Sequence, residues 1–358
     1  MANEETLLRV ENLCQHFRLD AKTVNKAVDN VSFEIKKGEV FGLVGESGCG
    51  KTTTGRSIIK LYDITSGSVY FKGERICAGV KSYKDAIAEA KKEKRGCSDP
   101  KRVAELDKII ADNKEEMKKA QMDHKKADRK LVNEIQMIFQ DPNASLDPRM
   151  TVRDIIAEGL LIKGIKDKEY IDQKVFEMLE TVGLVREHAS RYPHEFSGGQ
   201  RQRIGVARAL IMEPSLIIAD EPISALDVSI QAQVINLLHE LSEKMGLTIM
   251  FIAHDLAVVK YFSNRIAVMY FGKIVELATS DELFAHPFHP YTRSLLSAIP
   301  LPDPITEKNR QRIEYKPVLD HDYSKEGPSM REVYPGHFVY CNTEEFEKYR
   351  AEYEESGK

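Results

Sequence analysis

The residues best suited to chemistry form a glycine-rich stretch that ends in a lysine and two threonines. It runs Gly45, Glu46, Ser47, Gly48, Cys49, Gly50, Lys51, Thr52 and Thr53, and it matches the pattern GxxxxGK followed by Ser or Thr. Glycines let backbone N–H groups turn inward around phosphate, and a helix that starts there adds partial positive charge. We expect Lys51 to reach the β- and γ-phosphates and Thr52 to ligate Mg²⁺. The stretch therefore predicts a nucleotide-phosphate site.

Two adjacent carboxylates follow a second apolar run. Leu216–Ala219 is apolar at every position, and Asp220 and Glu221 come directly after it. Asp220 at the end of a strand suits water-mediated Mg²⁺ binding, and Glu221 could polarise an attacking water molecule. Two solvated acids would look the same in isolation, but the phosphate loop upstream favours the catalytic interpretation.

A second glycine-rich segment, Ser197, Gly198, Gly199 and Gln200, precedes a helix that the pattern predicts to start at Arg201. Taken alone, this segment could be a turn and a helix cap, or it could be another phosphate-binding helix start.

The elements that must position these residues alternate between strands and helices. Strand-length apolar runs occur at 40–44, 135–139, 216–219, 249–253 and 266–270, and helical patterns occur at 52–61, 171–182, 201–211 and 229–245. Continuous apolar runs are typical of strands buried on both faces of a mostly parallel sheet. The alternation predicts an α/β fold.

Two segments differ from this pattern. Residues 80–130 are rich in Lys, Glu and Asp, and Asp99-Pro100 is a favourable helix start. We interpret them as an inserted, charged helical hairpin, and a flexible charged loop is the alternative. Residues after Pro300 are rich in Pro, Tyr and charge, and they predict a tail that wraps the surface.

Bulk properties exclude several classes of protein. The net charge of −4 gives no electrostatic reason for binding nucleic acid. No apolar run approaches the ~18 residues of a membrane span. The acidic N-terminus lacks a signal-peptide core, and the five cysteines contain no CxxC pair, so we expect a reduced, cytoplasmic protein.

The order of these motifs resembles the ATP-binding-cassette (ABC) family over residues 6–300. The resemblance implies an ATPase that uses ATP and Mg²⁺ and has a P-loop NTPase core with a mostly parallel sheet. It also implies an antiparallel β subdomain and a helical signature subdomain. We therefore expect a nucleotide-binding domain at 1–300, containing the insertion at about 80–130, and a C-terminal extension at 301–358.

The resemblance also implies roles for single residues in the chain's own ATP site. Phe17 lies where the family places an aromatic that stacks on adenine. Gln140 matches the glutamine that senses Mg²⁺ and the attacking water, and His254 matches the histidine that contacts the γ-phosphate. The expected catalytic set consists of Lys51, Gln140, Glu221 and His254. The expected Mg²⁺ ligands are Thr52, Gln140 and Asp220.

Other matching residues would act on ATP held by a second subunit. Ser197, Gly198, Gly199 and Gln200 match the signature that contacts its γ-phosphate, and Asp227 ends the loop Ser224–Asp227 that touches the opposite site. Such subunits sandwich two ATP molecules head to tail, so the resemblance implies a partner ATPase.

A stretch near the C-terminus narrows the resemblance. His289–Leu296 reads HPYTRSLL, which resembles the C-terminal element of ATPases from oligopeptide and dipeptide importers, and the SGGQ sequence is similar to one of their two ATPases. This implies a sister ATPase, two transmembrane permeases, an external binding protein and a place at the cytoplasmic face of the membrane. Two alternatives remain: an importer of nickel or another small solute, and a soluble ABC ATPase acting on DNA or ribosomes. Many relatives carry a cysteine cluster in the C-terminal tail, where this chain has only Cys341.

Cys49 lies inside the phosphate loop, beside a lysine and a helix N-terminus, and both features favour thiolate. This arrangement predicts a reactive thiol that bound Mg-ATP would protect. The alternative is a small, buried and inert residue at a variable position of the motif.

Overall fold

A computed structural model of the chain describes residues 5–20, 22–127, 129–224, 226–299 and 312–356. The chain forms two compact units. The first contains Met1–Lys37, Thr52–Val132 and Phe271–Lys273, and the second contains Gly38–Lys51, Asn133–Tyr270 and Ile274–Lys358.

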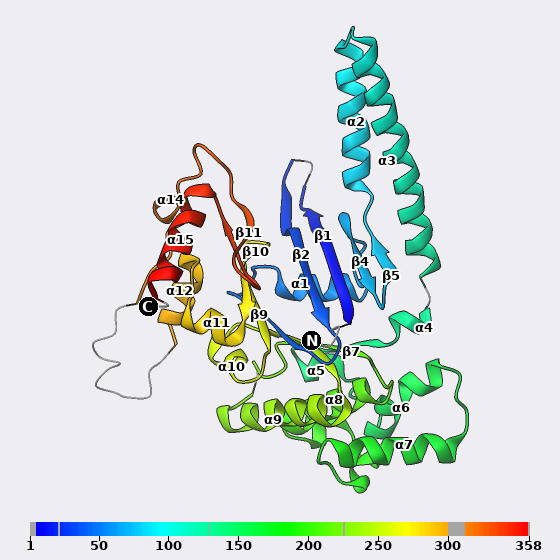
Figure 1. Cartoon of the computed structure of the whole chain (residues 1–358). Coiled ribbons are helices and arrows are strands. Elements are labelled where there is room, and N and C mark those ends of the chain that lie inside the picture. Colours follow the sequence, from blue (N-terminus) through cyan, green and yellow to red (C-terminus); the bar gives the residue numbers. More distant parts are fainter. Residues whose placement is uncertain (1–4, 21, 128, 225, 300–311, 357–358) are drawn as a thin grey trace. The chain divides into compact units, whose positions relative to one another are not determined.

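An antiparallel sheet organises the first unit (Figure 1). Its strands, in the order β2-β1-β4-β5, are Val24–Lys36, Thr6–Arg18, Ser66–Phe71 and Glu74–Ala78. Along β2, the buried residues Val31, Phe33 and Ile35 alternate with exposed neighbours, so one face of the strand packs into the core. The antiparallel β subdomain expected from the sequence is confirmed.

The charged segment is a helical hairpin in which α2 (Lys81–Gly96) and α3 (Pro100–Lys126) lie side by side (Figure 1). Asp99 caps α3, and its carboxylate accepts a hydrogen bond of 3.0 Å from the Lys101 N–H. The helices bury a small apolar cluster of their own, which consists of Ile87, Ala90, Leu106 and Ile110. This cluster explains why the segment is an ordered hairpin, and the flexible-loop alternative is wrong.

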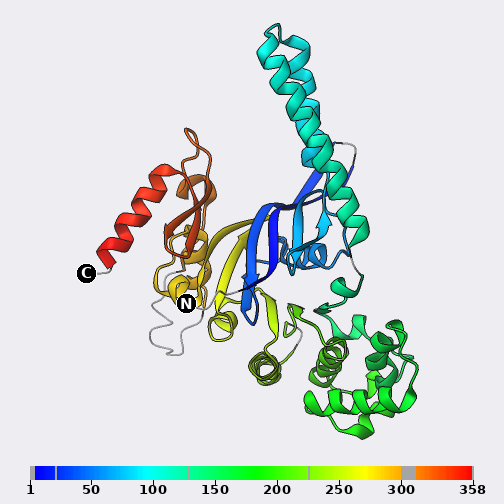
Figure 2. The same cartoon turned by 45° about the vertical axis from the view of Figure 1, so that its right-hand side comes forward.

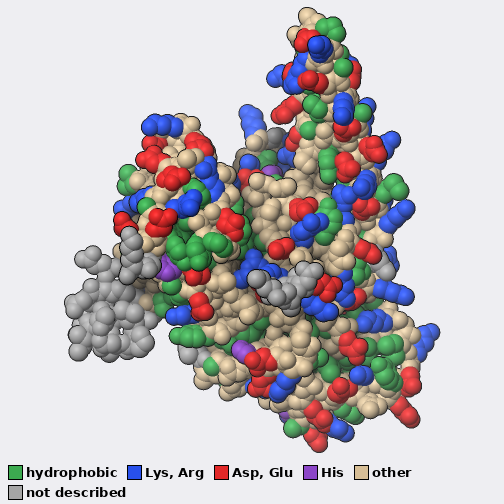
Figure 3. All heavy atoms as spheres, in the orientation of Figure 1, with side chains coloured by type: hydrophobic (Ala, Val, Ile, Leu, Met, Phe, Trp, Pro, Cys, Tyr) green, Lys and Arg blue, Asp and Glu red, His purple; other side chains and the backbone are tan. Residues whose placement is uncertain are grey.

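The last turns of α3 attach the hairpin to the rest of the first unit. Asp123 forms an ion pair with Arg75 of β5 at 2.9 Å, and the His124 carbonyl accepts a hydrogen bond from Lys60. Beyond these contacts, basic and acidic side chains are interspersed over the hairpin surface (Figure 3). A short helix, α4 (Arg129–Val132), follows α3.

The second unit contains an eight-stranded sheet in the order β11-β12-β10-β9-β3-β8-β7-β6. Five strands, β3 (Val40–Val44), β6 (Ile135–Ile138), β7 (Leu216–Asp220), β8 (Thr248–Ala253) and β9 (Arg265–Tyr270), form its parallel part. Every residue of β3, β7 and β8 is buried, as the continuous apolar runs predict. The mostly parallel sheet is confirmed.

Helices follow these strands along the chain. They include α1 (Lys51–Ile58), α5 (Pro142–Ser145), α6 (Val152–Ile162), α7 (Lys168–Thr181), α8 (Gly198–Leu210), α9 (Val228–Met245), α10 (Leu256–Lys260), α11 (Ser280–Ala285) and α12 (Pro290–Ser297), with two short 3₁₀ helices, η1 (Arg186–Ser190) and η2 (Pro193–Glu195). Helices α6, α7 and α8 pack together through buried apolar residues such as Ile156, Val175 and Ile204 (Figures 1 and 2). They are the helical subdomain that the sequence predicts.

The C-terminal residues form ordered elements, so the prediction of a tail wrapping the surface is wrong for 312–356. Strands β11 (Ser329–Tyr334) and β12 (His337–Cys341) extend the large sheet, because β12 pairs with β10 (Lys273–Thr279). Helix α15 (Thr343–Ser356) follows them, and α14 (Pro317–Asp320) precedes them. An apolar cluster of Phe288, Val333, Val339, Cys341 and Tyr349 holds these elements together. The expected domain boundary at 300–301 lies outside the described residues.

Replacing residues 82–118 by a short Gly-Ser linker is expected to leave ATP affinity unchanged. The replacement removes the apolar cluster of the hairpin but keeps Asp123 and His124, which attach α3 to the unit. ATP titration and thermal melting of the purified variant check this. A folded variant that no longer binds ATP would contradict it, whereas a defect confined to complex assembly or regulation would agree with it.

Candidate functional site

The candidate site lies at the carboxyl ends of neighbouring parallel strands. In the sheet register, Val44 of β3 lies beside Ala253 of β8, and Asp220 of β7 lies beside Ile252 of β8. Ile138 of β6 lies beside Ala219 of β7. The residues that follow these strands therefore emerge at the same edge, where α/β sheets commonly bind ligands.

The loop after β3 begins with a close backbone approach. A Cβ atom on Gly45 would lie 2.1 Å from the carbonyl oxygen of Met269, so only glycine fits there. Farther along the loop, Ser47 and Gly48 are exposed, and a Cβ atom on Gly48 would meet no atom within 4 Å. The loop is thus fixed at its start and open at its centre, as a backbone cradle for phosphate requires.

Lys51 is the buried cation of this loop. Its side chain is 3% exposed, and its Nζ donates to the carbonyl oxygens of Gly45 at 2.7 Å and Glu46 at 2.9 Å. Glu221 Oε1 lies 3.7 Å from the same nitrogen. The ammonium group is therefore held by the loop and by the carboxylate that follows β7.

Glu221 is where the predicted catalytic residues meet. Its Oε2 accepts a hydrogen bond of 3.0 Å from Gln140 Nε2 and lies 3.6 Å from His254 Nδ1. Its backbone has φ +44°, a left-handed conformation that is uncommon for a residue with a side chain. A cavity of about 40 Å³ borders Glu221, Ser224 and His254. The structure thus brings Lys51, Gln140, Glu221 and His254 together, and Asp220 is fully buried directly before Glu221.

The second glycine-rich segment is the start of α8, which begins at Gly198 instead of the expected Arg201. The reason is a reciprocal cap: the Gln200 N–H donates to Ser197 Oγ, and the Ser197 N–H donates to Gln200 Oε1. Both glycines therefore lie in the first helical turn. A Cβ atom on Gly199 would lie 2.3 Å from Ile230 Cγ2, so a larger residue there would force the Ile230 side chain on α9 to shift.

The remaining predicted residues lie on α9, α1 and β1. Asp227 is exposed at the start of α9, and Thr52 and Thr53 lie in the first turn of α1. Phe17 of β1 packs edge-on against Tyr62, with ring centroids 5.3 Å apart.

Cys49 is buried, as the alternative in the sequence analysis expected. The residue is 6% exposed, and burial raises the pKa of its thiol above the ordinary value. The nearby Lys51 ammonium acts in the opposite direction but does not outweigh burial. The expectation of thiolate character, which considered only the neighbouring charges, is therefore wrong.

One residue that contacts the loop was not expected to do so. The hydroxyl oxygen of Tyr291 accepts a hydrogen bond of 3.0 Å from the Glu46 N–H. Sequence reasoning included Tyr291 only in the C-terminal resemblance, because no local spacing connects residues so far apart in the chain.

Together, a strand-loop-helix phosphate site at the edge of a parallel sheet and a separate capped glycine helix start define an ATPase of the ATP-binding-cassette class. The chain belongs to the ABC transporter family, whose model matches residues 28–224. A second model, described as the C-terminal region of oligopeptide/dipeptide transporters, matches residues 275–326.

Curated relatives agree with this assignment over nearly the whole chain. The oligopeptide transport ATP-binding protein OppF of Bacillus subtilis is 56% identical over 346 residues, which cover 96% of this chain and 99% of that protein. The dipeptide transport ATP-binding protein DppF of Lactococcus lactis is 48% identical over 353 residues, which cover 98% of each. The family expected from the sequence is confirmed.

Solved structures agree on the fold. A dimeric ATP-binding cassette in a post-hydrolysis state, bound to ADP and Pi, is 26% identical. The match covers 76% of this chain and 99% of that chain, with a TM-score of 0.56. Within the described residues, no helix combines the length and the hydropathy that a bilayer crossing requires.

Maleimide at pH 7 is expected to label Cys97, which is partly exposed, well before Cys49 in the nucleotide-free protein. Because the pKa of Cys49 is raised, its thiolate fraction is small at pH 7 and grows only as the pH rises. Peptide mapping by mass spectrometry checks the order of labelling. Labelling of Cys49 at the rate of Cys97, with protection by Mg-ATP, would restore the reactive-thiol hypothesis.

Proposed function

We propose that the chain binds Mg-ATP at this strand-end site and hydrolyses it to drive uptake of oligopeptides or dipeptides through a membrane permease. The observation that carries the proposal is the convergence of Lys51, Gln140 and His254 on Glu221. The names of the relatives, which are oligopeptide and dipeptide transport ATP-binding proteins, support the substrate class.

The side chains proposed for this site are of the kinds that bind a nucleotide together with a metal ion. Residues 45–53 would surround the phosphates, and Lys51 would exchange its carbonyl partners for phosphate oxygens when ATP arrives. Phe17 would stack on the adenine. The Thr52 hydroxyl, the Gln140 amide oxygen and the Asp220 carboxylate are the oxygen donors that Mg²⁺ prefers. When bound, Mg²⁺ neutralises charge on the β- and γ-phosphate oxygens.

Glu221 would orient and polarise the attacking water. Its carboxylate borders the cavity of about 40 Å³, which is large enough for a water molecule. The Gln140 amide donates to the carboxylate and fixes its direction, while His254, whose side chain is 55% exposed, can turn toward a γ-phosphate. These residues therefore provide the water-orienting half of a hydrolytic site.

Ser197–Gln200 and Asp227 would complete the ATP site of a sister ATPase subunit. The first-turn N–H groups of α8 suit contact with a γ-phosphate presented by another chain. In the proposed assembly, this pair attaches to two transmembrane permease subunits at the cytoplasmic face of the membrane. An extracytoplasmic binding protein delivers substrate to the permease, and no nucleic acid takes part.

Glu221→Gln is expected to bind ATP but to lose roughly 10²–10⁴-fold in turnover, because the water loses the group that polarises it. ATP affinity should hold, since removing the negative charge also removes its repulsion of the γ-phosphate. Steady-state hydrolysis by the assembled complex and ATP titration check the two parts.

Glu243→Gln is the matched control, because Glu243 is an exposed carboxylate on α9 that pairs only with His239 in the described contacts. It should hydrolyse ATP at the wild-type rate. Near-normal turnover of Glu221→Gln would remove Glu221 from the catalytic role.

A further inference from the structure

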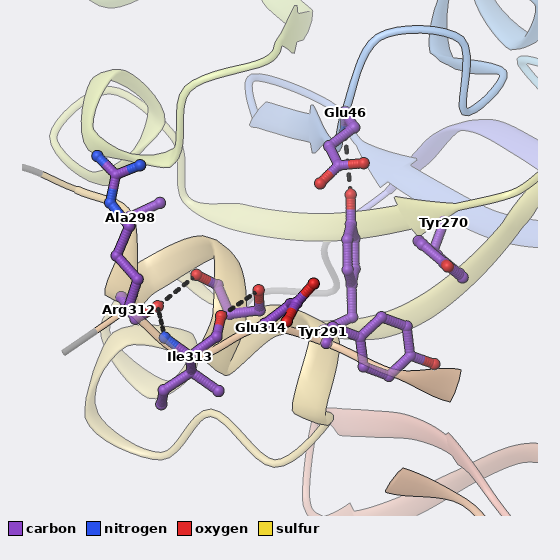
Figure 4. A pocket seen from close by; sticks show the side chains of 10 residues that line it. Glu46, Tyr270, Tyr291, Ala298, Arg312, Ile313 and Glu314 are labelled. Carbon is purple, nitrogen blue, oxygen red and sulfur yellow. Dashed lines mark hydrogen bonds between the residues drawn. The ribbon is translucent and has the colours of Figure 1, made fainter. Parts of the chain in front are cut away.

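Helix α12, near the C-terminus, contacts the phosphate loop through Tyr291. This residue lies in the first turn of α12 and is 1% exposed, and its hydroxyl points at Glu46 (Figure 4). The Glu46 N–H donates to the Tyr291 oxygen at 3.0 Å. Burial raises the pKa of Tyr291, so the hydroxyl stays neutral and brings no negative charge to the phosphate loop.

Glu46 connects this hydroxyl to the buried cation of the loop. The Glu46 N–H, which donates to Tyr291, lies in the same planar peptide group as the Gly45 carbonyl. That Gly45 carbonyl accepts a hydrogen bond of 2.7 Å from Lys51 Nζ. Tyr291 therefore fixes one of the two carbonyl groups that hold Lys51.

The Tyr291 ring has little freedom to move. Tyr270 at the end of β9 packs against it with ring centroids 4.4 Å apart, and Tyr315 packs against it at 5.5 Å. The same three tyrosines line a cavity of about 310 Å³ beside the loop (Figure 4). The aromatic cluster thus sets the direction of the hydroxyl.

The start of α12 is fixed by a buried carboxylate on β10. Glu276 is fully buried and accepts hydrogen bonds from the N–H groups of Phe288 and His289, at 2.8 and 3.1 Å. His337 of β12 lies 2.8 Å from the same carboxylate. The Tyr291 N–H donates to His289 Nδ1, so buried polar contacts connect the C-terminal strands to Tyr291. The partly buried hydrogen bond from the Glu46 N–H then connects Tyr291 to the loop.

We infer that Tyr291 is a positioning residue for nucleotide binding, whose hydroxyl fixes the Gly45–Glu46 peptide group and so sets the geometry of the phosphate loop. The inference rests on the proposed role of residues 45–53. An interaction changes nucleotide affinity only if its strength differs between the free and the bound state. When Lys51 binds phosphate, it gives up its hydrogen bonds to the Gly45 and Glu46 carbonyls. The hydrogen bond from the Glu46 N–H to Tyr291 then becomes a larger part of what holds the loop in place.

Tyr291→Phe tests this by removing one oxygen from a ring that stays in place. Leaving the Glu46 N–H without its Tyr291 partner is expected to raise the Kd for ATP and for ADP by about threefold to thirtyfold. Both nucleotides should be affected, because both place a β-phosphate in the loop. In the assembled complex, KM for ATP should rise while kcat at saturating ATP stays within about twofold.

Tyr315→Phe is the matched control. Tyr315 belongs to the same aromatic cluster, but its hydroxyl contacts His321 Nε2 at 3.0 Å and not the loop. Calorimetric titration of both full-length variants with ATP and ADP, together with melting curves, separates the two effects. Tyr315→Phe should keep wild-type affinity. Equal weakening of nucleotide binding in both variants, or unchanged nucleotide affinity in Tyr291→Phe, would overturn the inference.

A second measurement covers the case in which Tyr291→Phe fails to fold. Hydrogen exchange of the Glu46 amide in the nucleotide-free wild-type protein should be slow, and exchange as fast as in an unstructured loop would also overturn the inference.

Lys51→Ala separates the inference from the function on which it rests. If Lys51→Ala leaves ATP affinity unchanged, the phosphate-loop assignment fails. If it weakens ATP binding and Tyr291→Phe does not, only the role of Tyr291 fails.

Discussion

The register of three parallel strands is the constraint on which the site depends. Because β3 and β7 each pair in parallel with β8, the ends of all three strands lie at one edge of the sheet. Lys51, Glu221 and His254 are therefore brought together although they are far apart in the sequence. A slip of one residue in either pairing would send the following side chains to the opposite face. Complete burial of these strands on both faces resists such a slip.

The site keeps two local features that would be unfavourable elsewhere in a fold. A buried ammonium group must have partners, and Lys51 finds them in two loop carbonyls and a nearby carboxylate. Glu221 adopts a left-handed backbone conformation, which costs on the order of 1 kcal/mol for a residue with a side chain. Its N–H still pairs with the Ile252 carbonyl, so the sheet holds the unusual turn in place. In the proposed function, Lys51 would exchange its protein partners for phosphate, and Glu221 would turn to water.

Local patterns predicted much of the fold, and long-range packing decided the rest. Apolar runs predicted the buried strands, and Asp99-Pro100 predicted the start of α3, because these signals act within a few residues. The Tyr291–Glu46 contact and the C-terminal strands had no such signal, since they depend on which surfaces meet after folding. Cys49 was misjudged for the same reason: its neighbours in sequence are cationic, but burial in the folded loop dominates. The early start of α8 followed from a cap whose two partners lie only three residues apart, so that feature could have been predicted.

We propose that the phosphate loop and the capped start of α8 serve different ATP molecules, so that the chain carries one half of each of two ATP sites. The most direct measurement is the ATPase rate of the purified chain as increasing amounts of the sister ATPase subunit are added. We expect the chain alone to hydrolyse ATP slowly and the rate to rise to a plateau as the partner is added. Full activity of the isolated chain, independent of its concentration and of the partner, would show that one chain completes its own ATP site.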